Sequence, residues 1–220
     1  MSLESNGLIQ KDFRPISGWT ILFFMAVLAA LGALAVWYLR DHPRGLIGIL
    51  GLFYLVGLFS VVLAVSPMGR SAAPALGLRG ANWRYAVFGA VGTLALSVAV
   101  SQIGPEPEGM KQVIELAQDP RKLLPSLVAF ALLAPLVEEL VFRGLLYGWV
   151  ESRWGSMVAL VVSSLAFAGA HFEPAHIILV LPLGFLFGWL RRRTNSLVPS
   201  LCSHIANNGF AVLSAALLGS

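Results

Sequence analysis

Long apolar stretches separated by short clusters of charged residues make up most of this 220-residue chain. A helix needs about 20 mostly apolar residues to cross about 30 Å of hydrocarbon, because its backbone polar groups must bond to one another where no water reaches them. Seven runs approach that length, so we predict an all-α, polytopic transmembrane helical bundle of about seven to eight spans, in one domain covering residues 1–220. The runs are approximately 19–39, 45–65, 85–103, 124–150, 157–172, 174–190 and 197–219.

The composition agrees with a lipid-facing surface. Apolar residues make up 57% of the chain and charged residues 12%, against roughly 45–50% and about 25% in soluble domains. We therefore expect a multi-pass cell-membrane protein with the lipid bilayer as a partner. The net charge of +4 does not indicate a nucleic-acid partner, because most basic residues lie in short clusters between the apolar runs. The single cysteine, Cys202, excludes an internal disulfide.

Lys and Arg are distributed unequally between the two ends of the predicted spans. If all seven runs cross the membrane, nine Lys and Arg residues lie on the same side as the N-terminal segment 1–18, and five lie on the other side. Because basic loops stay in the cytoplasm, this excess predicts a cytoplasmic N-terminus. The nine are Lys11, Arg14, Arg70, Arg79, Arg84, Arg153, Arg191, Arg192 and Arg193, and the five are Arg40, Arg44, Lys111, Arg121 and Lys122.

Two connections have predictable local structure. In the segment 104–122, the residues Met110, Val113, Ile114 and Ala117 recur at helical spacing, which predicts a short amphipathic helix at the membrane surface. The runs 157–172 and 174–190 are separated only by Glu173, so we predict an antiparallel pair of helices with a tight turn at that point.

Three ionisable residues, Glu138, Glu139 and Arg143, stand within the apolar run 124–150. Each costs about 2.5–3.5 kcal/mol at the centre of a membrane helix, so we expect them to face the bundle interior or a hydrated cavity. Residues four apart share a helix face, which pairs Glu139 with Arg143 and leaves Glu138 without a local cation. We predict that Glu138 is a general base and that the pair supports it; the alternative is a salt-bridge network that only fixes helix packing.

Two further polar pairs occur in later runs at helical spacing. They are Phe167 with His171, and His204 with Asn208. Burying each polar group is costly, and one shared hydrated cavity is the simplest explanation for all of them. His176 follows Pro174, and we expect it to face away from this cavity.

In these motifs the chain resembles the CPBP family of intramembrane proteases, which includes the CAAX prenyl endopeptidases and bacteriocin-processing relatives. The family pattern EExxxR, FxxxH, HxxxN or HxxxD is matched in order by the three sets of residues above, within about 124–219. The resemblance implies that Glu138 and His171 hold the attacking water and that His204 and Asn208 stabilise the oxyanion, with Glu139, Arg143 and Phe167 in support. Family members often have eight helices, one more than the clear runs here.

The cofactor is left open by the sequence. Water activation by Glu138 and His171 needs no metal, and the HExxH signature of many zinc peptidases is absent. A zinc ion bound by Glu138, His171 and His204 is the alternative, since His₂Glu is a known catalytic ligand set. A covalent mechanism is disfavoured because Cys202 lies two residues from His204, on another face of the helix.

The leading hypothesis is therefore an intramembrane endopeptidase. Its expected partner is a membrane-associated protein tail of the CAAX type, with or without a lipid group, or a small peptide precursor. The alternatives are a non-catalytic peptide-binding scaffold or bacteriocin-immunity-type membrane protein, and a proton-coupled transporter.

Overall fold

The computed structural model describes residues 14–103 and 107–218, and this part of the chain is helical with no strand. The predicted all-α bundle is confirmed. Its helices are α2 (Gly18–Asp41), α3 (Leu46–Val65), α4 (Ala72–Ala75), α5 (Trp83–Ser101), α6 (Glu108–Gln118), α7 (Pro120–Ser126), α8 (Ala134–Glu139), α9 (Tyr147–Gly169), α10 (Pro174–Thr194) and α11 (Val198–Leu218). A 3₁₀ segment, η1 (Ser66–Ser71), precedes α4, and π-helical segments η2 (Leu127–Leu133) and η3 (Leu140–Leu146) flank α8.

A continuous helical segment, Pro120–Gly169, carries Glu138, Glu139 and Arg143 of the first motif and Phe167 of the second. It bends sharply at Gly155, where φ is 82°, a left-handed conformation that glycine adopts without the steric penalty of a Cβ atom. The two arms correspond to the predicted runs 124–150 and 157–172, and the bend lies within the connection 151–156. In the described part of the chain, five helical segments are long and apolar enough to cross a membrane, this bent one included.

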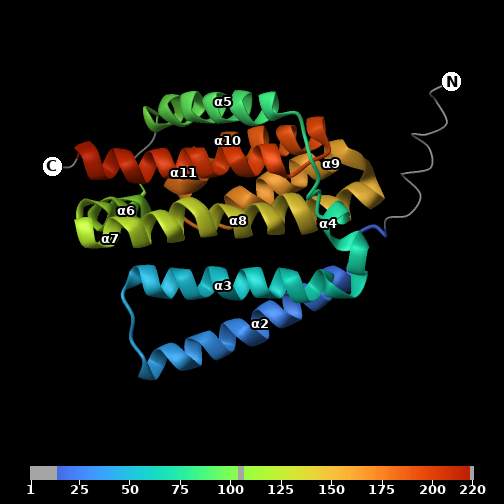
Figure 1. The fold of residues 1–220 in the computed structure, drawn as a ribbon, viewed down its shortest axis with the longest axis horizontal. Helices are drawn as coiled ribbons and strands as arrows, with labels where there is room; N and C mark the ends of the chain where they lie inside the picture. Colours follow the sequence, from blue (N-terminus) through green and yellow to red (C-terminus); the bar gives the residue numbers. More distant parts are fainter. Residues whose placement is uncertain (1–13, 104–106, 219–220) are drawn as a thin grey trace.

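The helices pack in layers around the bent segment (Figure 1). Helices α2 and α3 pair along one side of the molecule, α5 lies along the opposite side against α10 and α11, and α8 to α11 lie between them. One core cluster joins Phe24 of α2 and Val61 of α3 to Leu140 and Leu145 of η3. Helix α3 thereby packs beside α8 and η3, the segments that contain Glu138, Glu139 and Arg143.

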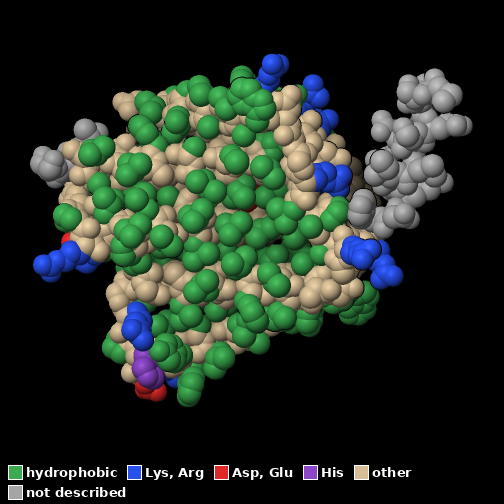
Figure 2. Space-filling view, in the orientation of Figure 1, with side chains coloured by type: hydrophobic (Ala, Val, Ile, Leu, Met, Phe, Trp, Pro, Cys, Tyr) green, Lys and Arg blue, Asp and Glu red, His purple; other side chains and the backbone are tan. Residues whose placement is uncertain are grey.

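The outer surface has the distribution expected of a membrane protein. Large apolar side chains are exposed along the spans, including Trp37, Phe88 and Leu165. Figure 2 shows hydrophobic side chains covering the middle of one face, with Lys and Arg gathered toward its two ends. A band of this kind matches a bilayer with polar regions above and below it.

Both predicted connections are present. Helix α6 is amphipathic: Ala117 is buried, and Val113 packs against a cluster with Phe130 and Val212. After α9 the chain reverses at Phe172, whose φ is 59°, and α10 begins at Pro174. The carboxylate of Glu173 in this turn accepts a hydrogen bond of 2.8 Å from the backbone N–H of Glu108, which ties the turn to the start of α6.

Candidate active site

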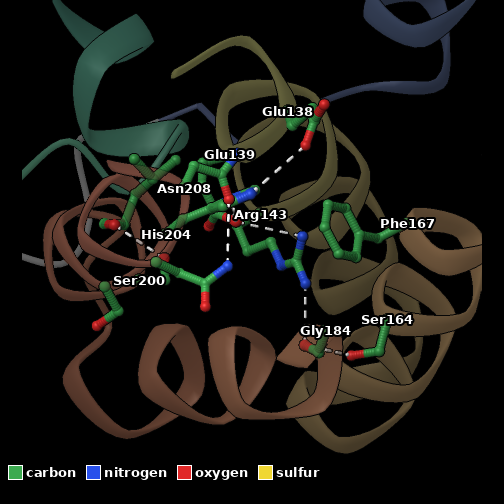
Figure 3. Close-up of polar contacts among 12 residues, drawn as sticks. Glu138, Glu139, Arg143, Ser164, Phe167, Gly184, Ser200, His204 and Asn208 are labelled. Carbon is green, nitrogen blue, oxygen red and sulfur yellow. Dashed lines mark hydrogen bonds and ion pairs between the residues drawn. The ribbon is translucent and has the colours of Figure 1, made fainter. Parts of the chain in front are cut away.

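Glu139 and Arg143 form the predicted ion pair. Arg143 Nη1 lies 3.3 Å from Glu139 Oε1, and both side chains are fully buried. Arg143 Nη2 donates a hydrogen bond of 2.9 Å to the carbonyl of Gly184 in α10, and the guanidinium lies 4.3 Å from the centre of the Phe167 ring. Figure 3 shows this cation enclosed by protein groups from three helices. The pair therefore links η3 to α9 and α10.

His204 of α11 lies between the two glutamates. Its Nδ1 is 3.2 Å from Glu139 Oε1, and its Nε2 is 3.6 Å from Glu138 Oε2 (Figure 3). The ring stacks on Phe187 with centroids 4.7 Å apart. A carboxylate that also pairs with Arg143 is an acceptor, so it orients His204 with Nδ1 as the donor and Nε2 toward Glu138.

Glu138 is the more accessible of the two carboxylates, with 19% of its side chain exposed against none for Glu139. Its Oε1 accepts a hydrogen bond of 3.3 Å from the hydroxyl of Tyr54, which comes from α3. Sequence reasoning missed Tyr54, because the motifs lie in other helices and nothing local in the run 45–65 marks this tyrosine. The neighbouring glutamates are thus placed differently: Glu139 in the protein interior and Glu138 at a cavity wall.

His171 lies just beyond the end of α9. Its Nδ1 bonds the carbonyl of Phe167 at 2.9 Å, and since a carbonyl only accepts, Nδ1 is the donor and Nε2 is left as an acceptor. Burial lowers the pKa of His171, which favours the neutral ring that such an acceptor requires. A neutral imidazole nitrogen can bind the hydrogen of a water molecule.

The expectation that His176 faces away from the site is wrong. Its ring lies 4.4 Å from that of His171 between centroids, in an edge-to-face arrangement, and it contributes to the same cavity. The reason is the turn: the left-handed residue Phe172 and the immediate start of α10 at Pro174 fold the first turn of α10 back over the end of α9.

A cavity of about 620 Å³ brings the predicted site residues together. Glu138, His171, His204 and Asn208 all line it, together with Tyr54, Phe167, His176 and Asn207. Most of the other lining side chains are apolar and come from α3, α6, α10 and α11. Residues from all three motifs, far apart in sequence, therefore line one cavity, as the sequence analysis predicted.

Asn208 already uses part of its hydrogen-bonding capacity. Its Nδ2 donates to the carbonyl of Phe130 at 3.0 Å, and its Oδ1 accepts from Asn207 Nδ2 at 3.3 Å. An amide nitrogen has two hydrogens, so one remains for another acceptor. Asn207 was not singled out from the sequence, although its position next to Asn208 was the available signal.

The exposed residues that line the cavity mark its opening. Ser101 ends α5, Gly109 lies in the first turn of α6, and Ala170 follows α9. These three helix termini lie on one side of the molecule. The first residues of α2 and the last residues of α10 lie on the opposite side (Figure 1). The opening therefore lies beside the end of α5, the start of α6 and the end of α9.

The described side chains form no ready zinc site. Zinc ligands lie about 2.0–2.2 Å from the metal, and among the described residues no group of three His, Cys, Asp or Glu side chains is arranged to hold an ion. His204 Nδ1 bonds Glu139 and Glu138 Oε1 bonds Tyr54, while His204 Nε2 and Glu138 Oε2 face each other at 3.6 Å. Cys202 is exposed on the outside of α11, in agreement with its predicted separation from His204.

Comparison with known proteins agrees with the motifs. Residues 120–210 match the model of the family described as type II CAAX prenyl endopeptidase Rce1-like. The predicted resemblance is confirmed. The chain is also 24% identical over 199 residues to a protein of Bacillus subtilis (strain 168) named "Putative membrane peptidase YdiL", which covers 89% of this chain and 70% of that protein. No solved structure matches the chain. These similarities support a membrane peptidase in general.

Proposed function

We propose that this chain is an intramembrane endopeptidase that cleaves a peptide bond with a water molecule activated by Glu138 and His171. The observation that carries the proposal is the cavity of about 620 Å³, which presents a partly exposed carboxylate beside three further polar side chains within an apolar bundle. A pure binding protein has no need of a base opposite hydrogen-bond donors. The Rce1-like match over the same helices supports the assignment.

The proposed reaction uses the side chains as the geometry places them. Glu138 takes a proton from the water while His171 Nε2 accepts the other hydrogen, and the water oxygen forms a bond to the carbonyl carbon. Asn208 Nδ2 and the His204 ring donate to the oxyanion. When the C–N bond breaks, Glu138 returns its proton to the leaving amine. Glu139 and Arg143 hold His204 and the helices in position.

The substrate is proposed from the shape and placement of the cavity. Its apolar walls suit a membrane-associated chain, and its opening lies at the end of the molecule opposite the start of α2. The cluster of Arg residues at the other end supports a cytoplasmic N-terminus. We therefore favour a membrane-anchored tail or a small peptide precursor whose cleaved bond lies near the surface opposite the N-terminus.

The decisive experiment is cleavage of a peptide library by the protein purified in detergent. The parent is expected to cut, Glu138→Gln to be inactive, and Glu115→Gln, an exposed carboxylate change on α6, to cut like the parent. Equal cleavage by the parent and Glu138→Gln would refute Glu138 as the base. A parent that binds peptides without cutting them would favour the scaffold hypothesis instead.

A further inference from the structure

Tyr54 is the polar contact of the proposed base that comes from outside the three motifs. Its hydroxyl donates to Glu138 Oε1 at 3.3 Å, and its ring lines the cavity. It belongs to α3, outside residues 120–210 that match the Rce1-like family. Neither the motif pattern nor the family match assigns this residue a role.

The two oxygens of Glu138 have different partners. Oε1 meets Tyr54 on one side and Oε2 faces His204 Nε2 at 3.6 Å on the other. A carboxylate on a flexible side chain has several rotamers, and a hydrogen bond to one oxygen selects among them. Without Tyr54, the described residues leave Glu138 with only the longer contact to His204, and the carboxylate would lose its fixed direction toward the cavity.

Close packing of α3 against α8 brings the tyrosine within reach. Gly57 lies one turn after Tyr54, and a Cβ atom there would come within 2.8 Å of Val137 Cγ1. Val137 immediately precedes Glu138 and is buried. The same face of α3 continues with the buried residues Ser60, Val61 and Ala64. A small residue at 57 thus allows the helices to approach closely enough for the hydroxyl to reach the carboxylate.

We propose that Tyr54 is a positioning residue for catalysis, which holds the Glu138 carboxylate in the orientation that accepts the proton of the attacking water. The role rests on the proposed peptidase function, because it acts through the base. It adds a helix outside the motif segment to the machinery of the site. The prediction is a defect in the chemical step rather than in substrate binding.

The first test compares kcat and KM of Tyr54→Phe with those of the parent on a cleaved peptide. Misdirecting a reacting group can cost about a hundredfold in rate, so we expect kcat to fall by about tenfold or more while KM changes by less than about twofold. Tyr38→Phe, the same change in α2, is the matched control and keeps the parent's kcat, because the Tyr38 hydroxyl accepts a hydrogen bond from Arg44 and the residue does not line the cavity. The infrared carboxylate band of Glu138, identified by its loss in Glu138→Gln, is expected to shift in Tyr54→Phe and not in Tyr38→Phe.

A second test keeps Tyr54 and alters its distance from Glu138. Gly57→Ala is expected to push α3 away from Val137 and to lower kcat as Tyr54→Phe does, because the valine side chain is stiff and cannot turn aside. Gly57→Ala combined with Val137→Ala removes the clash and should recover most of the parent's kcat, with Val137→Ala alone as the control. This pair also tests the proposal if Tyr54→Phe fails to fold.

The outcomes separate this proposal from the function on which it rests. A parent that cuts no peptide overturns both the peptidase function and the role of Tyr54. A parent that cuts, together with a Tyr54→Phe variant of unchanged kcat and unshifted carboxylate band, overturns the positioning role alone. Loss of activity in Gly57→Ala that Val137→Ala does not repair overturns the argument from close packing.

Discussion

Replacement of Arg143 by methionine is expected to destabilise the protein strongly, because three different groups depend on the guanidinium. Removing it leaves the fully buried carboxylate of Glu139 without its cation at 3.3 Å, at a cost of about 3–5 kcal/mol for a broken buried pair. The carbonyl of Gly184 loses the hydrogen bond from Arg143 but keeps the one from the hydroxyl of Ser164 at 2.9 Å. The contact with the Phe167 ring at 4.3 Å is lost as well.

Thermal unfolding in detergent measures this cost. For a chain of this size, about 3–5 kcal/mol corresponds to a fall in Tm of about 6–20 °C. The double variant Glu139→Gln with Arg143→Met removes both charges, and His204 Nδ1 can still donate to the glutamine oxygen at residue 139. An uncharged pair of similar volume often matches a buried ion pair in stability. We therefore expect the double variant to recover at least half of the fall in Tm caused by Arg143→Met.

Activity is expected to respond differently from stability in this series. Glutamine in place of Glu139 holds His204 less firmly than a carboxylate does. The kcat of the double variant should therefore remain well below that of the parent, even though its stability is largely restored. If the double variant were no more stable than Arg143→Met alone, the two side chains would not be coupled and the reasoning would be refuted. A double variant with full activity would refute the supporting role while leaving the pairing intact.

Four other predictions concern the oxyanion, the histidine pair, the orientation and the metal. Asn208→Ala should lower kcat by about 10²–10³, and should lower Tm as well because the Phe130 carbonyl loses its donor; a change in kcat of less than about threefold would exclude Asn208 as an oxyanion donor. His176→Ala should lower kcat by about 2–10-fold, from the loss of its edge-to-face contact in the cavity wall, and an unchanged rate would show that the contact is dispensable. In a Cys202→Ser background, an impermeant maleimide applied to intact cells should label a cysteine at Gly109 and not one at Gly80; the reverse pattern would invert the proposed topology. Dialysis against strong chelators should leave cleavage intact, whereas a loss restored by added Zn²⁺ would overturn the metal-free mechanism.

Local patterns account for the part of the fold and site that the sequence predicts. Apolar runs bounded by charges indicate helices, a spacing of four pairs Glu139 with Arg143, and the pattern in 104–122 indicates the amphipathic α6. Each of these depends on residues within one or two helical turns, where backbone geometry alone decides which side chains meet. The ordered motifs add the prediction that three distant helices share a cavity.

Contacts between helices are what the sequence could not predict. Tyr54 reaches Glu138 only because α3 packs closely at Gly57, and Arg143 finds the carbonyl of Gly184 only once α10 lies against η3. Backbone carbonyls have no sequence signature, and small residues in membrane helices are too common to specify one partner. The position of His176 depends on one left-handed residue, Phe172. The sequence predicted a tight turn at this point, but it did not predict the direction in which the turn sends the chain.

The adjacent glutamates show how one helix can separate structural and chemical roles. Consecutive residues differ by about 100° around a helix axis, which turns Glu139 toward Arg143 in the interior and Glu138 toward the cavity. Full burial with a cation gives Glu139 a fixed charge that orients His204, and partial exposure leaves Glu138 able to meet water. Exchanging these environments would place the paired carboxylate at the cavity and an unpaired charge in the core. The order of roles within the two-glutamate motif therefore follows from which face of the helix turns toward Arg143 and which toward the cavity.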